Sequence, residues 1–417
     1  MDQRDHRKNL LAIYHAALAA VEGRRAVADF LRGQEMPGPV YLVAIGKAAA
    51  SMARGAHEQL GNTIAGGVVI TRHGYGQDIT QRLPSLCLIE AGHPIPDERS
   101  ILAGRVLLSF LRQIPGDGVL LFLLSGGASS LVEVLPEGVG LPDLQRANTW
   151  LLASGLPIDR VNAVRKSLSC IKGGRLARYL PPIPVWNLLI SDVPGDDVDM
   201  IGSGLLVGQE SGPLSQSIRD KLPAWLLHLV ERAPAFPVDK LRSTTIDTTI
   251  VANSLMARQA AMRVARHMGY CVCLHEQDLR GEVSVIARKL VQCLRKKPAM
   301  LHVWGGETTV RLPDNPGQGG RCQHLALQVA CLLQNDQGRA CFFLAAGTDG
   351  SDGPGDTAGA LVDEGSLKRG QHEGLDAGTC LQRADAGRFL QASGDLLQTG
   401  VTGTNVMDLM LGLGFQP

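Results

Sequence analysis

The sequence predicts an α/β protein of two domains. Short apolar runs typical of strands alternate with amphipathic helical patterns along both halves of the chain. The 417 residues exceed what one hydrophobic core usually holds. Between the two halves, Pro234 and Pro237 disfavour helix and suit an extended connector. We therefore expect an N-terminal domain over residues 1–236 and a C-terminal domain over residues 237–417.

The first half carries four strand-like runs, at residues 40–45, 68–71, 119–124 and 185–190. Residues 48–60 form the clearest helical pattern among them. Strands that alternate with helices in this way predict a parallel sheet with helices on its faces, which is a Rossmann-like arrangement.

The second half repeats the alternation, with expected strands at residues 249–252, 271–275, 301–304 and 341–345. Helical patterns at residues 255–267 and 283–294 separate them. We therefore expect a second α/β domain. At the start of the chain, residues 10–21 place apolar side chains at helical spacing, unlike a secretory signal.

Composition and charge exclude several classes of partner. Forty-one basic and forty acidic residues leave a formal charge of +1, so we expect neither nucleic acid nor an acidic membrane as a partner. No apolar run reaches the ~18 residues of a membrane span. The pair Cys271 and Cys273 lacks the spacing of zinc or thioredoxin motifs, and we interpret all nine cysteines as reduced and structural in a cytoplasmic protein. The sequence leaves open whether the chain forms a homo-oligomer.

Three expected strands end in glycine-rich turns, at residues 124–130, 304–309 and 346–350. Ligands of open α/β sheets bind beyond the carboxyl ends of the strands, and glycine there lets backbone N–H groups approach a phosphate. Tight turning alone is the competing explanation for each glycine pair. From these turns we take as candidate ligand-binding residues Ser125, Gly126, Gly127, Ser129, Gly306 and Glu307, with Asp349 as a candidate metal ligand.

Charged residues near other strand ends complete the candidate set. Lys47 follows the first strand, where a helix would begin and an anion could bind. Arg165, Lys166 and Lys172 form a basic stretch that could hold phosphates or a carboxylate, although a solvated helix face explains it equally well. Asp192 follows the strand at residues 185–190 and could hold Mg²⁺ or accept a hydroxyl proton, unless it only forms a turn.

Several catalytic classes are excluded by missing motifs. The segment before Lys47 is not a P-loop, because Tyr41 stands where its first glycine belongs and Ala48 replaces Ser or Thr. No HExxH, GxSxG or GxGxxG occurs in a supporting context, which argues against zinc proteolysis, serine hydrolysis and a Rossmann dinucleotide site. Glycine, lysine, arginine and aspartate at strand ends suit phosphoryl transfer, which needs positioning and cations around the transferring group.

These segments, in this order, resemble the glycerate 2-kinases of the MOFRL family. The resemblance implies two α/β domains with the active site in the cleft between them, and ATP- and Mg²⁺-dependent phosphorylation of D-glycerate to 2-phosphoglycerate. It also implies that Lys47 and Arg321 are catalytic cations. The matching segments are residues 43–49, 91–97, 124–130, 164–175, 191–197, 305–308, 319–321, 345–359 and 402–405.

Three positions depart from the family pattern: Cys322 and His324 stand where Asn and Glu are expected, and Ser167 replaces a His. The apolar helical pattern at residues 325–333 puts this segment at a helix N-terminus, where backbone N–H groups could bind an anion whatever residue 322 is. We expect the departures to alter glycerate affinity or selectivity.

In the resulting mechanism Lys47, Asp192 and Arg321 are the catalytic residues, and Asp192 and Asp349 supply carboxylates for Mg²⁺ or the glycerate hydroxyl. Two other interpretations stay open. An NAD(P)H-dependent hydroxypyruvate reductase is opposed by the missing dinucleotide fingerprint. A non-catalytic relative that binds glycerate-like ligands is opposed by the retained cations and aspartates.

Overall fold

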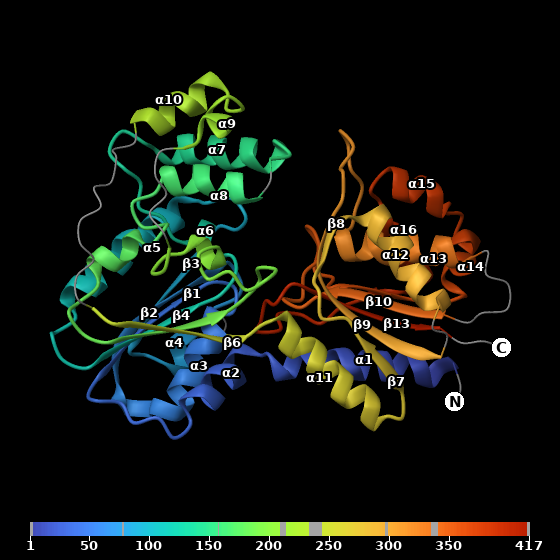
Figure 1. The fold of residues 1–417 in the computed structure, drawn as a ribbon, viewed down its shortest axis with the longest axis horizontal. Helices are drawn as coiled ribbons and strands as arrows, with labels where there is room; N and C mark the ends of the chain where they lie inside the picture. The colour runs from blue at the N-terminus through green and yellow to red at the C-terminus, as the bar shows by residue number, and fades with distance from the viewer. Residues whose placement is uncertain are drawn as a thin grey trace. The chain divides into compact units, whose positions relative to one another are not determined.

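The computed structural model describes residues 3–76, 79–156, 158–208, 214–232, 244–296, 299–334 and 341–414. The chain divides into two compact units, which we describe separately: the N-terminal unit is residues 23–251, and the C-terminal unit is residues 1–22 together with 252–417. The expected boundary near residue 237 lies outside the described residues. The units differ from the expected domains at two elements, because α1 (Gln3–Ala20) packs on α11 (Ser254–His267) and β6 (Ile246–Ala252) joins the first sheet (Figure 1).

The N-terminal unit is built on a six-stranded sheet in the order β3-β2-β1-β4-β5-β6. Neighbouring strands from β3 to β5 pair in parallel, as the sequence predicts. The chain runs from β1 outward to β3 and then returns to the other side of β1, so the strand order reverses between β1 and β4. The strands are β1 (Val40–Ile45), β2 (Ile64–Arg72), β3 (Leu86–Ala91), β4 (Val119–Leu124) and β5 (Val185–Ile190).

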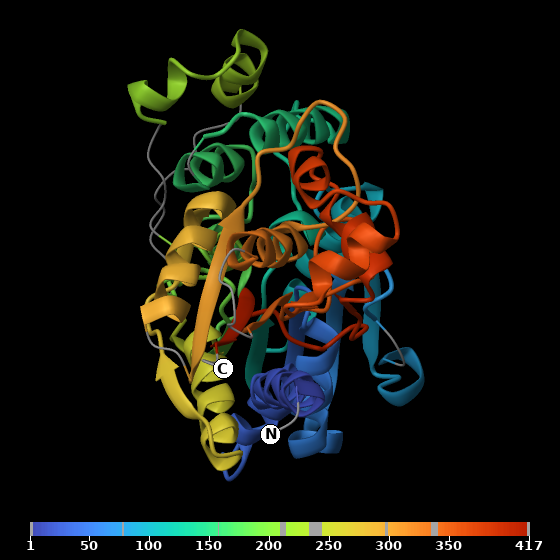
Figure 2. The ribbon, with the colours of Figure 1, turned by 90° about the vertical axis from the view of Figure 1, so that its right-hand side faces the viewer.

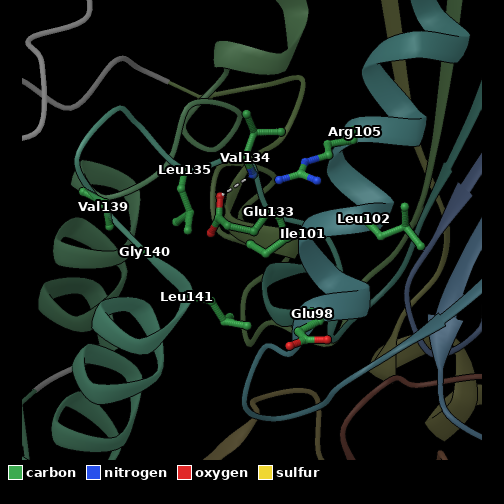
Figure 3. Close-up of a pocket in the computed structure, with 10 residues that line it drawn as sticks. All are labelled: Glu98, Ile101, Leu102, Arg105, Glu133, Val134, Leu135, Val139, Gly140 and Leu141. Atoms are coloured by element: carbon green, nitrogen blue, oxygen red, sulfur yellow. Dashed lines mark hydrogen bonds between the residues drawn. The ribbon is translucent and has the colours of Figure 1, made fainter.

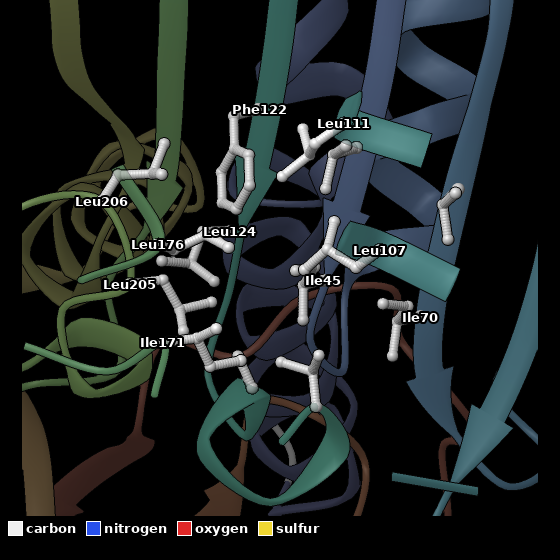
Figure 4. Packing of buried hydrophobic residues seen from close by; sticks show 14 of the residues in the cluster. Ile45, Ile70, Leu107, Leu111, Phe122, Leu124, Ile171, Leu176, Leu205 and Leu206 are labelled. Atoms are coloured by element: carbon white, nitrogen blue, oxygen red, sulfur yellow. The ribbon is translucent and has the colours of Figure 1, made fainter. Parts of the chain in front are cut away.

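Helices cover both faces of this sheet (Figure 1). One face packs on α3, and Figure 4 shows the core of the other, where Phe122 and Ile45 meet Leu107 and Leu111 of α5. A separate small apolar cluster joins α7, α8, α9 and α10. The helices are α2 (Gly23–Leu31), α3 (Ala49–Leu60), α4 (Ile79–Arg82), α5 (Glu98–Gln113), α6 (Ala128–Leu131), α7 (Leu141–Ala153), α8 (Ile158–Ser167), α9 (Gln216–Arg219) and α10 (Ala224–Arg232), with short 3₁₀ turns at Gly61–Thr63, Arg175–Tyr179 and Ile201–Ser203.

The C-terminal unit has a mixed sheet in the order β12-β11-β10-β13-β9-β7, with β8 also paired to β9. The last strand of the chain, β13, lies antiparallel between β10 and β9 in the middle of the sheet, whereas β7 and β8 run parallel to β9. The strands are β7 (Cys271–Leu274), β8 (Leu279–Glu282), β9 (Met300–Thr309), β10 (Cys341–Gly347), β11 (Gly359–Val362), β12 (Leu396–Leu397) and β13 (Asp408–Gly414).

Helices lie on both faces of this second sheet, so the expected α/β class is confirmed. Figure 2 shows α1 and α11 on one face and the remaining helices on the other. In α12 the buried residues recur at helical spacing, from Val283 through Ile286 and Leu290 to Leu294, which gives the helix one apolar face against the sheet. The helices of that second face are α12 (Val283–Lys296), α13 (Arg321–Leu333), α14 (Ser366–His372), α15 (Ala377–Gln382) and α16 (Ala386–Ser393).

One expected turn is wrong: β9 does not end at Trp304 but continues through Gly305 and Gly306 to Thr309. Both glycines are explained by close packing. A Cβ on Gly306 would lie 2.2 Å from the carbonyl oxygen of Leu279 in β8, and a Cβ on Gly305 would lie 2.4 Å from the hydroxyl of Ser254. The glycine pair therefore lets β8 and α11 approach β9 closely.

Among the described residues, no helix is long and apolar enough to cross a membrane. All nine cysteines lie in the described ranges and are free thiols, as expected.

Candidate active site

Two loops of the N-terminal unit meet where the strand order reverses. The Lys47 amide after β1 donates to the carbonyl of Gly126 after β4 (2.9 Å), and the Ser125 amide donates to the carbonyl of Ile45 (2.9 Å). The Ala48 amide donates to the Ser125 hydroxyl (3.0 Å). Ligands of doubly wound folds bind at this point of reversal. The loop that carries Lys47 and the glycine-rich turn, both expected from the sequence, are thus held together by hydrogen bonds.

Glycine is required in both loops. Gly46 has φ +127°, and a Cβ there would lie 2.2 Å from the Ser125 hydroxyl oxygen. Gly127 has φ +86°, and its Cβ would lie 3.1 Å from Cδ2 of His93 and 3.2 Å from Cγ of Lys47. The Lys47 side chain and the His93 ring therefore flank Gly127. His93 is a neighbour to which the sequence assigns no role.

Ser125 and Ser129 of this turn make hydrogen bonds within the protein. Ser125 is fully buried, and its hydroxyl holds the loop after β1 in place. The Ser129 hydroxyl accepts a hydrogen bond from Ser203 (2.9 Å). These contacts make Ser125 a support for the backbone of the two loops.

Asp192 is the second residue after β5. It lies at the same carboxyl edge of the sheet as the other two loops, because β1, β4 and β5 are parallel neighbours. It is partly exposed, while Ser191 before it is buried. The edge of the sheet thus carries Lys47, the Gly126-Gly127 turn and Asp192 side by side in strand order.

The three cations of the basic stretch have different surroundings. Arg165 donates from Nε to Asn148 (2.9 Å), and burial lowers its pKa. Lys166 donates to the carbonyl of Asp199 (3.1 Å), and burial likewise lowers its pKa. Lys172 lies buried against the equally buried carboxylate of Glu133. The structure therefore does not bring the three cations to one exposed face.

A cavity of about 620 Å³ opens beside Glu133 (Figure 3). None of its lining residues belongs to the loops after β1, β4 and β5, and none is among the residues expected from the sequence. The Glu133 carboxylate at its wall also accepts from the Val134 amide (3.0 Å) and the Ser169 hydroxyl (2.5 Å). The cavity is lined by Glu98, Ile101, Leu102, Arg105, Glu133, Val134, Leu135, Val139, Gly140 and Leu141.

In the C-terminal unit, Arg321 is the first residue of α13 and is held by two carboxylates. Its Nε and one terminal nitrogen donate to the two oxygens of Asp408 (2.6 and 2.9 Å), and the other terminal nitrogen lies 2.8 Å from Glu307. Burial opposes its charge, but Asp408 and Glu307 outweigh this and raise the pKa of Arg321. This bidentate pairing with Asp408, which we call the fork, fixes the direction of the guanidinium group.

Asp408 is a residue that the sequence reasoning misses. As the first residue of β13 it lies opposite Gly347 of β10 and Gly306 of β9, and its side chain is 1% exposed. The sequence could have indicated Asp408, because it directly precedes the apolar run 409–414. If that run is a buried strand, the carboxylate needs a cation or a hydrogen-bond donor beside it.

The N-terminus of α13 already binds a carboxylate of the protein. Asp352 accepts from the amides of Cys322 (3.0 Å) and Gln323 (2.8 Å). A Cβ on Gly320 would lie 2.3 Å from the Asp352 carboxyl carbon, so Gly320 makes this approach possible. Burial raises the pKa of Asp352 to about 6. The expectation that these amides receive a substrate anion is therefore wrong.

Asp349 lies in the turn after β10 and is also buried. Its carboxylate accepts from the amide of Ser351 (2.9 Å), and a Cβ on Gly347 would lie 3.3 Å from that carboxylate and 3.6 Å from Asp408. Tyr14 of α1 donates to the Gly347 carbonyl (2.8 Å). Burial, Cys322 and nearby aspartates raise the pKa of Tyr14, which reflects a region rich in carboxylates.

The two remaining departures from the family pattern make local contacts. The Ser167 hydroxyl donates to the carbonyl of Val164 (2.6 Å) within α8. His324 lies in the first turn of α13, and burial lowers its pKa.

Comparisons with known proteins agree with this architecture. Residues 300–408 match the MOFRL family, and residues 9–222 match a domain of unknown function, DUF4147. A D-glycerate 2-kinase of Thermotoga maritima is 36% identical over 99% of both chains. The chain belongs to the glycerate 2-kinase family. A second member, the glycerate 2-kinase of Pyrococcus horikoshii, is 33% identical over 96% of this chain and 93% of its own.

The fold of the glycerate 2-kinase family extends over the whole chain. The crystal structure of a glycerate kinase from Thermotoga maritima matches with a TM-score of 0.83 and 34% identity, covering 98% of this chain and 99% of that one. The family resemblance read from the sequence motifs is thereby confirmed.

Proposed function

We propose that this chain transfers the γ-phosphoryl group of ATP to the C2 hydroxyl of D-glycerate, which yields 2-phosphoglycerate and ADP. The observation that carries the proposal is the full-length identity to glycerate 2-kinases, 36% and 33% in two relatives. The loops after β1 and β4, at the reversal of strand order, are the kind of site where doubly wound folds bind ligands.

In the reaction the glycerate hydroxyl oxygen attacks the γ-phosphorus, the bond to the β,γ-bridging oxygen breaks, and the hydroxyl proton passes to a carboxylate. Negative charge spreads over the moving phosphoryl group and the leaving ADP. Fixed cations and positioned groups lower the barrier of such a transfer more than covalent chemistry does.

In the N-terminal unit, we propose that Lys47 binds an anionic group of the reactants. Its backbone is bonded to Gly126, and its side-chain stem lies beside Gly127. Gly126, Gly127 and Ser129 belong to the same turn. Arg165 and Lys166 stay candidates for further positive charge, although each already donates to a partner elsewhere in the unit. Asp192, at the same edge of the sheet, is our candidate acceptor for the hydroxyl proton.

In the C-terminal unit, we propose that Arg321 stabilises the negative charge that develops on the phosphoryl group. The fork from Asp408 and the contact with Glu307 hold the guanidinium in one orientation before the substrates bind. A cation that needs no reorientation during the reaction stabilises a transition state more than a mobile one.

Mg²⁺ is the metal that we propose to accompany ATP. Asp192 in the N-terminal unit and Asp349 in the C-terminal unit are two separate candidates for its carboxylate ligand, and for Asp192 this role is the alternative to accepting the hydroxyl proton. Carboxylate oxygens are the donors that Mg²⁺ prefers, and both side chains supply them. When bound, the ion would neutralise charge on the β- and γ-phosphates.

We propose structural roles for Ser125, Lys172 and Gly306. Ser125 bonds the loop after β1, Lys172 is paired with Glu133, and Gly306 admits the backbone of β8. Their substitution should act mainly through stability and positioning.

The test is an assay of the purified chain with ATP, Mg²⁺ and D-glycerate, followed by ADP release and by ³¹P NMR of the product. We expect ADP release that depends on D-glycerate and a phosphate ester at C2. Parallel reactions with L-glycerate and tartronate test selectivity, and hydroxypyruvate with NADH or NADPH tests the reductase. Binding of D-glycerate without ADP release from any of these acceptors would overturn the proposal in favour of a non-catalytic relative.

A further inference from the structure

Three potential metal ligands converge at the edge of the second sheet. Cys273 lies in β7, His275 follows that strand, and His302 lies in β9. One ligand atom from each lies within 4.8 Å of the other two. Among the residues that the structure describes, only this cluster brings three such side chains so close.

Strand register explains the convergence. β7 pairs with β9 in parallel, and Cys273 lies directly opposite His302. His275 is two residues beyond Cys273, so its side chain points to the same face of the sheet. The His275 amide also donates to the Val303 carbonyl of β9 (3.0 Å), which extends the pairing past the end of β7.

The two imidazole rings are held in place by their neighbours. Nε2 of His275 and Nδ1 of His302 are 3.0 Å apart. Both rings stack on Trp304, at centroid distances of 4.8 and 5.0 Å. The buried Arg258 donates to the His275 carbonyl (2.5 Å) and pairs with Asp278 (2.6 Å), which anchors the turn after β7.

We propose that Cys273, His275 and His302 bind a transition-metal ion of the zinc class. A thiolate and two imidazoles are the ligands that Zn²⁺ favours, with bonds of about 2.0–2.3 Å. Those bond lengths separate tetrahedral ligand atoms by roughly 3.3–3.8 Å, so the cluster needs only small side-chain shifts to close around an ion. Binding releases the thiol proton of Cys273, and water completes the fourth position.

This site is independent of the Mg²⁺ proposed for phosphoryl transfer. Its donors are sulfur and nitrogen, whereas Mg²⁺ requires oxygen ligands, and it shares no residue with Asp192 or Asp349. Its effect would be mechanical, since one ion would tie the edge strand β7 to β9. The sequence hides the site because one ligand lies on a different strand, far from the other two along the chain.

The first test uses metal-free protein under reducing conditions with excess Mg²⁺ present. Isothermal titration with Zn²⁺ should show one ion bound per chain, and saturating Zn²⁺ should raise the melting temperature by roughly 5–10 °C. Titration with Co²⁺ should give tetrahedral d–d absorption together with a near-ultraviolet thiolate-to-cobalt band. The same Co²⁺ titration should quench the fluorescence of Trp304, which contacts both rings.

Variants identify the ligands. Cys273→Ser should abolish the thiolate band, and His275→Gln should weaken Zn²⁺ binding by more than about 100-fold, because even residues behind a metal ligand cost 10- to 100-fold. Cys271→Ser is the matched control, an exposed cysteine of the same strand that lies outside the cluster. Metal-free melting curves check that each variant folds.

Three results would overturn the assignment. One is no Zn²⁺ binding in the presence of Mg²⁺. Another is a Co²⁺ complex without a thiolate band. The third is a loss of binding in Cys271→Ser as large as that in Cys273→Ser. His275 is only half-buried, so its variant decides the matter even if a substitution of the buried His302 unfolds the unit.

Discussion

Replacing Asp408 with asparagine tests whether the direction of Arg321 matters for catalysis. The introduced amide would keep one acceptor oxygen but would turn its N–H₂ group toward a guanidinium that can only donate. One of the two bonds, now 2.6 and 2.9 Å long, would be lost, and the charge that assists both would disappear. One remaining neutral bond to residue 408 and the contact with Glu307 would then orient Arg321.

Two magnitudes follow from this geometry. Removing one partner of a buried ion pair costs about 3–5 kcal/mol, but Arg321 is 36% exposed, so we expect a loss of about 1–3 kcal/mol in the free energy of unfolding. Misplacing a cation by about 1 Å costs about 10²-fold in rate. We therefore expect kcat/KM for D-glycerate to fall about 100-fold, or about 2.7 kcal/mol in transition-state energy, mostly through kcat.

The assay is ADP release at varied D-glycerate, with Asp395→Asn as the control. Asp395 is fully buried in the same unit and pairs with Arg369 (2.7 Å) and Arg7 (3.0 Å), none of which belongs to the candidate site. Asp395→Asn should lose stability and keep its kcat/KM. If Asp408→Asn retains kcat/KM within threefold while both variants are destabilised alike, Asp408 is only a structural residue and the role of Arg321 must be reconsidered.

Three further changes test other parts of the structure. Lys47→Ala should lower kcat/KM by about 10²-fold through loss of a charge-assisted transition-state contact, whereas the exposed-lysine control Lys221→Ala should not. Lys172→Met should lower the free energy of unfolding, measured by urea titration, by about 3–5 kcal/mol, because it leaves Glu133 buried and unpaired, and adding Glu133→Gln should recover most of the loss. The pKa of Asp352 is raised to about 6, so its contribution to stability is fully present below about pH 4 and is lost as the pH rises through 6. Urea titrations from pH 4 to 7 should therefore show that the difference in the free energy of unfolding between Asp352→Asn and the parent changes by about 3 kcal/mol.

Each of these expectations has a contrary result. A Lys47→Ala protein within threefold of the parent removes Lys47 from catalysis. Equal stability losses in Lys172→Met and in the double variant mean that packing of the lysine stem, not the ion pair, stabilises this region. A difference between Asp352→Asn and the parent that is constant with pH means that Asp352 is ionised throughout and that its amide donors outweigh its burial.

The N-terminal sheet follows closely from the sequence. The expected strands at residues 40–45, 119–124 and 185–190 coincide with β1, β4 and β5, and the expected helix at residues 48–60 begins one residue early. These strands are almost entirely buried, so they are predominantly apolar runs, with Asn187 of β5 as a buried polar exception. Lys47 and the Gly126-Gly127 turn could be paired from sequence because parallel strands bring their carboxyl ends to one edge.

The C-terminal unit is less accessible to sequence reasoning because its contacts join distant parts of the chain. No local sequence pattern shows that β13 enters between β10 and β9. None shows that α1 packs on α11 either, because residues 23–251 separate the two helices along the chain. The fork between Asp408 and Arg321 depends on that strand insertion, so the same non-local pairing hides the site residue. The glycine pair in β9 misleads for the opposite reason, since its cause is the packing of β8 and not a turn.

The occupied N-terminus of α13 changes how the family departures at Cys322 and His324 act. A free helix N-terminus would let the backbone bind a substrate anion, but here the amides of Cys322 and Gln323 are bonded to Asp352. In our proposal the reactant anions at this end of α13 are bound by the Arg321 side chain. The Cys322 amide makes its contact whatever side chain residue 322 carries. The departures are therefore compatible with turnover, and their effect should fall on the affinity and selectivity for glycerate-like acids.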